Sequence, residues 1–572
     1  HKKVGITARG AWECVKRHFR EMGKDIQSEP FTVAGIGDMS GDVFGNGMLL
    51  SEHIRLIAAF DHRHVFIDPD PDPAVTYAER TRLFGLGRSS WADYDTSLLS
   101  EGGMVVPRGS KAVELTPQAR AALGLDEDPG KLNGEELIRL VLQAPVELLG
   151  NGGIGTYVKA SDETPADAGD ASNDAVRIDA PQLRAQVVGE GSNLGLTQAA
   201  RVEYSLAGGR INTDALDNSG GVSLSDREVN LKILLGPAVR SGQLESEARN
   251  DLLERLTDDI ADRVLHDNWS QSLAVSLDEL RLGDHLDEFR DVMFALERSG
   301  LLDRAAEGLP TLETLVECVE YGATLTRPEL CVLLAYAKLS IKAQLSDSAL
   351  LDDATVQQYM VDYFPTEARQ VVGSEAVASH ALRRDIISSQ LTNDLVDLMG
   401  STFVHRLTRD TGRDAADVVH AWLIAAHLAR HQEIIDAMIE RRSALKTRDT
   451  YRWGLGLGRV LERTTRWLLD HIEPDQRVVT VIENYREGLE VLQQHFAEVV
   501  AGDDRVVFEQ RVAELKSVGA DDVLARRLIT LRFLDQALEI LGIAREVDAD
   551  VLETAHVFYR LSELLSVPWL RE

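Results

Sequence analysis

The spacing of hydrophobic residues along the chain changes near residue 240. Upstream of that point, short apolar runs alternate with stretches in which hydrophobic residues recur every three or four positions. Helical spacing covers 11–22 and 135–143. The apolar runs are bounded by Gly, Asn or Asp, as strand ends are, and they predict strands over 31–34, 54–60, 146–149 and 186–189. Strands that alternate with helices predict an α/β domain over 1–240 with a mostly parallel sheet.

Two segments of this first region fit the alternation poorly. Residues 80–130 show neither period clearly, and we interpret them as an insertion. Residues 161–175 are polar and rich in Asp and Ala, which predicts a surface loop.

Downstream of residue 240, strand signals nearly vanish and the helical period dominates. This predicts a large all-α C-terminal domain over 241–572, in which the Trp, Leu and Tyr residues are interpreted as core. No spacing typical of a catalytic motif occurs there. The segments with the strongest helical pattern are 244–266, 277–297, 329–345, 367–399, 415–440 and 478–500.

Charge and cysteine content narrow the possible functions. A net charge of −32 repels phosphate backbones and anionic lipid, so we expect neither nucleic acid nor a membrane as a partner. Cys14, Cys318 and Cys331 lack the spacing of a zinc site or a disulfide framework, and we expect reduced thiols in a cytoplasmic protein. The chain begins at His1 and enters helical spacing almost at once, so we expect further protein upstream.

A glycine turn follows the first predicted strand, in Val33-Ala34-Gly35-Ile36-Gly37-Asp38-Met39-Ser40-Gly41. In a dinucleotide-binding turn, Gly35 makes the bend, Gly37 lets the backbone approach a pyrophosphate, and a small residue at position 40 or 41 lets the next helix pack closely. The alternative is an ordinary glycine turn. The context favours a Rossmann-like site, for which the candidate residues are Gly35, Gly37, Asp38, Met39 and Ser40.

An acidic residue follows the second predicted strand. Asp61 is placed to accept hydrogen bonds from an adenosine ribose and to repel a 2′-phosphate, which favours NAD over NADP. Arg63 argues against this preference, because its guanidinium group would suit a phosphate. Asp68 is the second candidate for the acidic role. His62 and His64 have ligand chemistry, but we expect no metal, because loop histidines are usually solvated or structural.

A glycine cluster follows the third predicted strand, in Asn151-Gly152-Gly153-Ile154-Gly155. It is either a plain loop or a place where the backbone approaches a nicotinamide ribose. Glycines at strand ends of open α/β sheets commonly line the ligand crevice, so we take Asn151 and Gly152 as cofactor-binding candidates.

Further motifs resemble those of amino-acid dehydrogenases, glutamate dehydrogenases in particular. Ile6-Thr7-Ala8-Arg9-Gly10 is similar to a helix start whose Thr bonds the nicotinamide carboxamide, which implies that role for Thr7. Val187-Val188-Gly189-Glu190-Gly191-Ser192-Asn193 and Asp217-Asn218-Ser219-Gly220-Gly221-Val222-Ser223-Leu224-Ser225 resemble two more family motifs. By resemblance, Asn193 and Asn218 lie near the cofactor and Ser225 binds the distal carboxylate of glutamate.

The run from His1 to about Leu235 is more similar still to the large NAD-specific glutamate dehydrogenases of bacteria. The resemblance implies oxidative deamination of L-glutamate to 2-oxoglutarate and ammonia by a homo-oligomer, a tetramer or hexamer. In that family the catalytic lysine and acid come from a substrate domain that precedes the nucleotide domain. We therefore expect the catalytic residues upstream of His1, and we expect this chain alone to bind NAD without turnover.

Two other interpretations remain open. The chain is alternatively a non-catalytic NAD-binding scaffold, or a related NAD-dependent amino-acid dehydrogenase with an apolar substrate. Asn193 and Asn218 argue against a scaffold, which needs no nicotinamide contacts. Ser225 argues against an apolar substrate, which needs no hydroxyl at that point.

Overall fold

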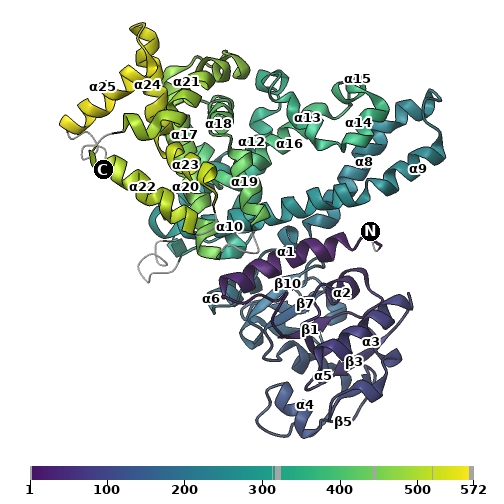
Figure 1. The fold of residues 1–572 in the computed structure, drawn as a ribbon. Coiled ribbons are helices and arrows are strands. Elements are labelled where there is room, and N and C mark those ends of the chain that lie inside the picture. Colours follow the sequence, from purple (N-terminus) through teal and green to yellow (C-terminus); the bar gives the residue numbers. More distant parts are fainter. Residues whose placement is uncertain are drawn as a thin grey trace. The chain divides into compact units, whose positions relative to one another are not determined.

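The computed structural model describes residues 3–311, 313–315, 324–441, 446–500, 502–517 and 520–565, so Cys318 lies outside the described residues. The chain forms two compact units (Figure 1). The first comprises residues 1–337 and 362–383, and the second comprises 338–361 and 384–572. The compact units thus follow a different division from the one near residue 240, which stays a prediction.

A six-stranded sheet forms the centre of the first unit. Its order is β10 (Val187–Glu190), β7 (Leu148–Asn151), β1 (Phe31–Ile36), β2 (Ile54–Phe60), β3 (His64–Ile67) and β4 (Met104–Pro107). Neighbours from β10 to β2 run parallel, whereas β3 and β4 pair antiparallel. The predicted α/β class with a mostly parallel sheet is therefore confirmed, and each predicted strand corresponds to an observed one.

The sheet reverses its direction of growth at β1. The chain passes from β1 to β2 on one side and later returns to place β7 and β10 on the other. In open α/β sheets such a switch point leaves a crevice at the carboxyl ends of the strands, where ligands bind. This edge therefore positions the candidate site.

Helices cover both faces of the sheet, as Figure 1 shows. On one face α1 (Ile6–Glu21), α2 (Asp42–Gly47) and α3 (Pro73–Gly85) share a core with alternate strand residues such as Phe31 and Val33. On the other face α5 (Gly134–Leu142) and α6 (Gln198–Leu206) pack with residues such as Ile36 and Phe60. Burial on both faces explains why these strands appear as continuous apolar runs.

The interpretation of 80–130 as an insertion was wrong in part. Strand β4 from this segment joins the main sheet, and β5 (Val113–Glu114) pairs with β6 (Lys131–Leu132) beside α4 (Pro117–Ala122). These strands are too short to show a period of their own. The predicted loop 161–175 consists mainly of exposed turn residues, between β8 (Val158–Lys159) and β9 (Ile178–Asp179).

The first unit also contains helices that follow the sheet. They are α7 (Asp214–Asp217), α8 (Ser219–Arg240), α9 (Ser246–Arg255), α10 (Thr257–Arg298), α14 (Thr366–Val372) and α15 (Ser374–Ala378). The residues of the two helices predicted over 244–266 and 277–297 form α9 and α10, and α10 consists of two helical segments joined by a kink at His285, whose φ is −136°. The helix predicted over 367–399 is interrupted at Gly373, whose φ is +82°.

Helices α12 (Arg327–Leu345) and α13 (Gln357–Tyr363) include two of the three points where the chain passes between the units. The second unit is helical throughout the part that the structure describes. Its further helices are α16 (Arg383–Met399), α17 (Phe403–Thr411), α18 (Ala415–Ala429), α19 (His431–Glu440), α20 (Thr447–His471), α21 (Val478–Val499), α22 (Gly502–Ser517), α23 (Asp522–Thr530), α24 (Leu534–Glu546) and α25 (Val551–Leu564).

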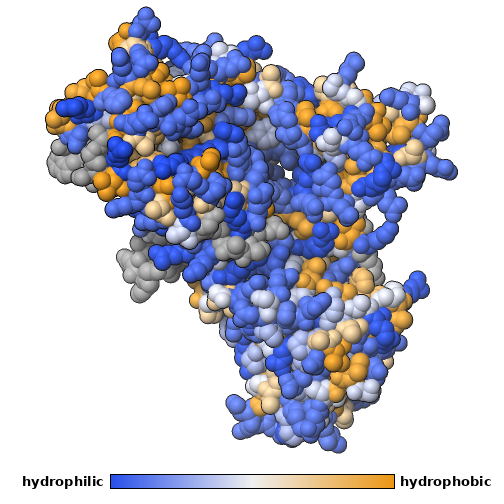
Figure 2. Space-filling model, viewed as in Figure 1, coloured by the Kyte–Doolittle hydropathy of each residue, from blue (hydrophilic) through white to orange (hydrophobic). Residues whose placement is uncertain are grey.

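The most apolar stretch of the chain is helix α18, which is the centre of the second unit. Its Trp422 is fully buried, and His420 bonds the carbonyl of Gln476 at 2.8 Å. The helix predicted over 415–440 ends early because Arg430 adopts φ +50°. No helix within the described ranges is long and apolar enough to cross a bilayer. On the face drawn in Figure 2, hydrophilic residues cover most of the surface.

Candidate functional site

The glycine turn after β1 closes tightly on helix α2. A Cβ on Gly35 would lie 2.2 Å from Cε2 of Phe44, and one on Gly37 would lie 2.7 Å from its Cβ. Gly37 also has φ +139°, which side chains rarely adopt. Both positions therefore require glycine, as the motif predicts. The side chain of Met39 is buried in the hydrophobic core, so it presents no side-chain contact to a ligand.

Asp38 organises the rest of this turn. Its Oδ1 accepts from the Ser40 backbone N–H at 2.8 Å, from the Ser40 hydroxyl at 2.6 Å and from the Gly41 N–H at 3.1 Å. The Ser40 hydroxyl is thereby held against Asp38. An ordered turn of this kind presents its backbone to a ligand without the entropic cost of ordering a loop on binding.

Asp61 lies at the carboxyl end of β2, facing the turn. Its Oδ1 accepts from the backbone N–H groups of Arg63 and His64, each at 2.6 Å. Its Oδ2 is buried and has no hydrogen-bond partner within the described part of the chain. Burial raises the pKa of Asp61; the two backbone bonds oppose that rise, and the nearby Asp38 carboxylate adds to it. An orphaned buried oxygen is costly unless a ligand satisfies it.

The other two residues considered for this role are placed differently. Because β3 is antiparallel to β2, Asp68 at the end of β3 lies beside the middle of β2, where its N–H donates to the Ile57 carbonyl at 2.8 Å, and away from the carboxyl end where Asp61 lies. There it accepts from the Ser100 N–H at 3.0 Å. Arg63 extends a nitrogen to 3.9 Å from Asp38 and donates to the Ser89 carbonyl at 3.2 Å. Asp61 is therefore the acidic residue at the crevice.

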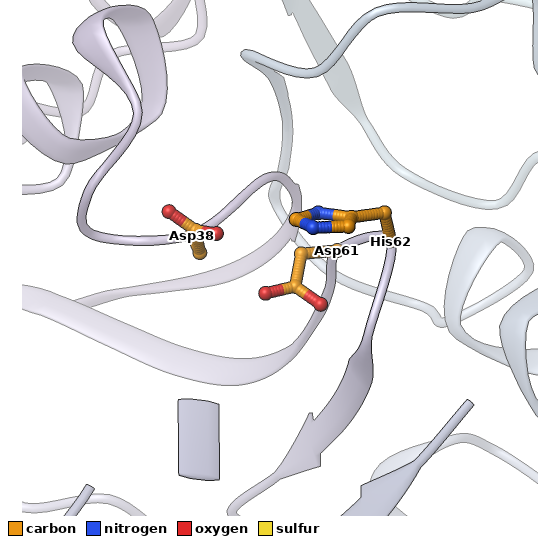
Figure 3. Close-up of side chains that lie close together, drawn as sticks. All are labelled: Asp38, Asp61 and His62. Atoms are coloured by element: carbon orange, nitrogen blue, oxygen red, sulfur yellow. The ribbon is translucent and has the colours of Figure 1, made fainter. Parts of the chain in front are cut away.

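Asp38, Asp61 and His62 come close together at this edge (Figure 3). One ligand atom from each lies within 4.8 Å of the others, and no other trio of possible metal ligands within the described ranges meets this criterion. The two carboxylates are buried and His62 is exposed. The expectation that the protein holds no metal stays a prediction.

Asn151 and Gly152 follow β7, beside the turn. The Asn151 side chain is 2% exposed, and neither its Oδ1 nor its Nδ2 has a partner among the described residues. A Cβ on Gly152 would lie 2.6 Å from the backbone N of Phe44, so the loop approaches α2 closely. These residues line a cavity of about 40 Å³ at the carboxyl ends of β7 and β10, together with Val43, Phe44, Gly189 and Gly191.

Of the residues assigned by resemblance, Asn193 and Asn218 contact each other, whereas Thr7 and Ser225 each lie against Gly221. Asn218 donates from its amide to Oδ1 of Asn193. Thr7, in the first turn of α1, approaches the first turn of α8 so closely that a Cβ on Gly221 would lie 2.5 Å from its Oγ1. One turn further along α8, the Ser225 hydroxyl donates to the Gly221 carbonyl at 3.3 Å. Gly221 and Ser225 thus lie one turn apart on α8, and Thr7 on α1 faces the first of them.

Sequence reasoning missed a buried polar cluster next to Asn218. Asp217 is fully buried and accepts from the Glu190 N–H at 2.9 Å and from the Asn212 amide at 2.7 Å. Burial raises its pKa to about 7, against the opposing effect of these hydrogen bonds. Glu190 in turn pairs with Arg201 at 2.6 Å. Asp217 precedes Asn218, so the cluster fixes α7 to the end of β10.

The acidic residues of this cluster are visible in the sequence, but nothing in their spacing shows that they are buried. Acidic residues in the Gly189-Glu190-Gly191 and Asp217-Asn218 segments look like exposed loop residues until their neighbours are known. The site as a whole offers a glycine turn, two orphaned buried polar groups and a set of amide and hydroxyl groups at one sheet edge. This arrangement suits an extended polar ligand with hydroxyl groups at one end and an amide at the other.

Comparison with known proteins agrees with the resemblance that the sequence motifs show. Residues 1–278 match the family model described as bacterial NAD-glutamate dehydrogenase, catalytic domain, and residues 322–572 match glutamate dehydrogenase, C-terminal. The chain is 44% identical over 573 residues to an NAD-specific glutamate dehydrogenase of Halomonas elongata and 44% identical over 584 residues to one of Mycobacterium tuberculosis. Each alignment covers 100% of this chain and 35% of the relative, so the chain spans about a third of their length.

Proposed function

Because this chain belongs to the bacterial NAD-glutamate dehydrogenase family, we propose that the crevice at the carboxyl edge of its sheet holds NAD. The observation that carries the proposal is the pair of orphaned buried groups, Asp61 Oδ2 and the Asn151 amide, on either side of the glycine turn. Ribose hydroxyls would satisfy Asp61, and Asn151 would donate to and accept from the nicotinamide half.

The other candidates divide between the two ends of the cofactor. Gly35, Gly37, Asp38 and Ser40 shape the turn toward the pyrophosphate, and Gly152 keeps the backbone clear on its other side. Thr7, Asn193 and Asn218 would orient the nicotinamide amide by hydrogen bonds. NAD supplies a hydride acceptor when bound. The carboxylate of Asp61 would reject the 2′-phosphate of NADP by charge repulsion.

We further propose that the whole protein oxidatively deaminates L-glutamate to 2-oxoglutarate and ammonia. Ser225 would bind the distal carboxylate, since its hydroxyl lies one turn of α8 from Gly221, which Thr7 approaches from α1. The groups that move protons in this reaction are expected outside this chain, because no lysine accompanies Ser225 among the residues assigned to the site. We place the reaction in the cytoplasm, where NAD and glutamate are available.

A fluorescence titration of this chain with NADH tests the cofactor proposal. We expect saturable binding that is at least tenfold tighter than that of NADPH, together with no measurable glutamate turnover. Absence of NADH binding at millimolar concentration would overturn the cofactor proposal. Appreciable turnover by this chain would instead place the catalytic lysine within it.

We also propose that the protein assembles as a homo-oligomer, a tetramer or hexamer. Val557, Leu561 and Leu564 recur at helical spacing on α25 with exposed fractions of 58%, 50% and 73%. A helix that exposes such a stripe is typical of an interaction surface. Sedimentation of the full-length protein should give a smaller species when Leu561 and Leu564 are changed to Asp, and an unchanged species would contradict this surface.

A further inference from the structure

The second unit contains a large cavity between helices α20, α22 and α23. Its volume is about 570 Å³, within the range of about 300–1,000 Å³ that small-molecule sites occupy. One part of its wall is apolar and includes Trp453, Leu457 and Ile529. Five arginines line the rest, namely Arg452, Arg459, Arg463, Arg511 and Arg532.

The arginines converge because of helical spacing and packing. Arg452, Gly456, Arg459 and Arg463 follow one another at intervals of four, three and four residues, which places them on one face of α20. Arg511 on α22 and Arg532 after α23 face the same cavity. A Cβ on Gly456 would meet no atom within 4 Å, so the middle of this face is open.

Carboxylates neutralise only part of this charge. Asp449 and Glu514 also line the cavity, which leaves five arginines against two carboxylates. Glu514 is shared, since it lies 3.0 Å from Arg511 and 3.7 Å from Arg452. Arg463 reaches Asp535 at 3.4 Å. Arg459 and Arg532 have no ion pair with any carboxylate of the described residues.

The unbalanced charge has a cost in the folded protein. Burial and the nearby charges of Arg511, Arg463, Arg459 and Arg452 lower the pKa of Arg532. The chain as a whole has a net charge of −32, so a concentration of positive charge here is not a consequence of overall composition. Like charges held together around a cavity favour an anionic ligand, which removes their repulsion on binding.

We propose that this cavity is a binding site for a small organic polyanion, whose phosphate or carboxylate groups are held by Arg459 and Arg532. The apolar wall at Trp453 and Leu457 accommodates the ligand's carbon skeleton or ring. A guanidinium group pairs with the oxygens of a phosphate or of a carboxylate. Any ligand of this cavity therefore carries two or more such anionic groups. The cavity lies wholly in the second unit, and the site is therefore distinct from the proposed NAD crevice in the first.

Calorimetric titration of this chain tests the site. The probes are inorganic tripolyphosphate, a nucleoside triphosphate and propane-1,2,3-tricarboxylate, with acetate at matched ionic strength as the reference. We expect at least one polyanion to bind and to raise the unfolding temperature, whereas acetate does neither. The probe that binds most tightly identifies the anionic group that the cavity prefers. Tighter binding of the nucleoside triphosphate than of tripolyphosphate would show that the apolar wall contributes to affinity.

A pair of double variants separates this site from general charge effects. Arg459→Gln with Arg532→Gln should weaken polyanion binding at least tenfold. Arg477→Gln with Arg560→Gln, which removes two exposed arginines of the same unit outside the cavity, should leave it unchanged. Equal weakening in both double variants, or no binding of any polyanion at millimolar concentration, would overturn the proposal. The unfolding temperature of each variant shows that the comparison is between folded proteins.

Discussion

The crevice of the first unit and the cavity of the second are built by opposite means. The crevice depends on the absence of side chains, because Gly35, Gly37 and Gly152 let the backbone and Phe44 approach within distances that no Cβ allows. The cavity depends on long side chains that hold like charges around a space of about 570 Å³. The crevice is therefore closely packed and is assembled from strand-end turns that lie far apart in sequence, whereas the cavity is lined by three helices and has five arginines against two carboxylates.

The comparison teaches which substitutions each region tolerates. A strand-end turn that already fills its space has no room for added atoms. A cavity wall on a helix face does have room, and its energetics respond to charge more than to volume.

Glycine substitutions should separate the two regions most clearly. Gly37→Ala places a Cβ 2.7 Å from Phe44 at φ +139°, so we expect a loss of about 1–3 kcal/mol in stability and at least a tenfold loss in NADH affinity. Gly456→Ala adds a Cβ in open space on a helix and should stabilise by about 1 kcal/mol. Urea unfolding measures the stability of each variant, and NADH titration measures its affinity for the cofactor. Similar destabilisation by the two substitutions would contradict the difference between the crevice and the cavity.

Asp217 should make the stability of the first unit depend on pH. Its folded pKa of about 7 lies above the ordinary 3.8, so between these values the folded state retains a proton that the unfolded state has lost. The contribution of Asp217 to stability is therefore present at low pH and is lost as pH rises toward 7. As pH rises through this window, the free energy of unfolding of Asp217→Asn should increase relative to that of the parent by on the order of 1–3 kcal/mol. Thermal unfolding from pH 4 to 8 measures the difference, and a constant difference would contradict burial of an ionisable Asp217.

Substitutions at Asp61 and Asp68 should separate ligand recognition from local structure, because Asp68 lies away from the carboxyl end of β2. Asp61→Asn should weaken NADH binding about tenfold, or about 1.4 kcal/mol, because an amide is a poorer acceptor for ribose hydroxyls. It should also reduce the preference for NADH over NADPH. Asp68→Asn should leave NADH affinity unchanged.

The pH dependence of NADH binding has a definite sign. Burial raises the pKa of Asp61, so on acidification the carboxylate becomes protonated at a higher pH than an exposed Asp does, and affinity falls there. In Asp61→Asn this dependence should disappear. Retention of the same profile in the variant would assign it to another group.

The smallest expected effect lies in the cavity. Arg532→Gln removes one of five like charges and should raise stability by about 0.5 kcal/mol, a modest amount because solvent screens partly exposed charges. The gain should shrink at high salt and in the presence of a bound polyanion. Destabilisation by this change at low salt would show that Arg532 makes a favourable contact instead.

Elements that depend on neighbours along the chain could be predicted from the amino-acid sequence. The strands, the glycine turn and Asp61 could be predicted because a buried strand requires an apolar run, a tight turn requires glycine, and the next strand end follows at a regular distance. The helical character of the second region followed from periodicity in the same way. The helix break at Arg430 and the kink in α10 at His285 were not predictable, because packing decides where an amphipathic pattern bends.

Only the tertiary structure decided which polar residues are buried and which charges converge. Asp217 and Glu190 look like loop acids until β10 and α7 enclose them, and Asp68 looks equivalent to Asp61 until β3 turns antiparallel and places it beside Ile57 in the middle of β2. The arginines at 459, 511 and 532 are tens of residues apart and share a cavity only after three helices pack. Local spacing sets backbone conformation, whereas burial and electrostatic potential depend on every segment that surrounds a residue.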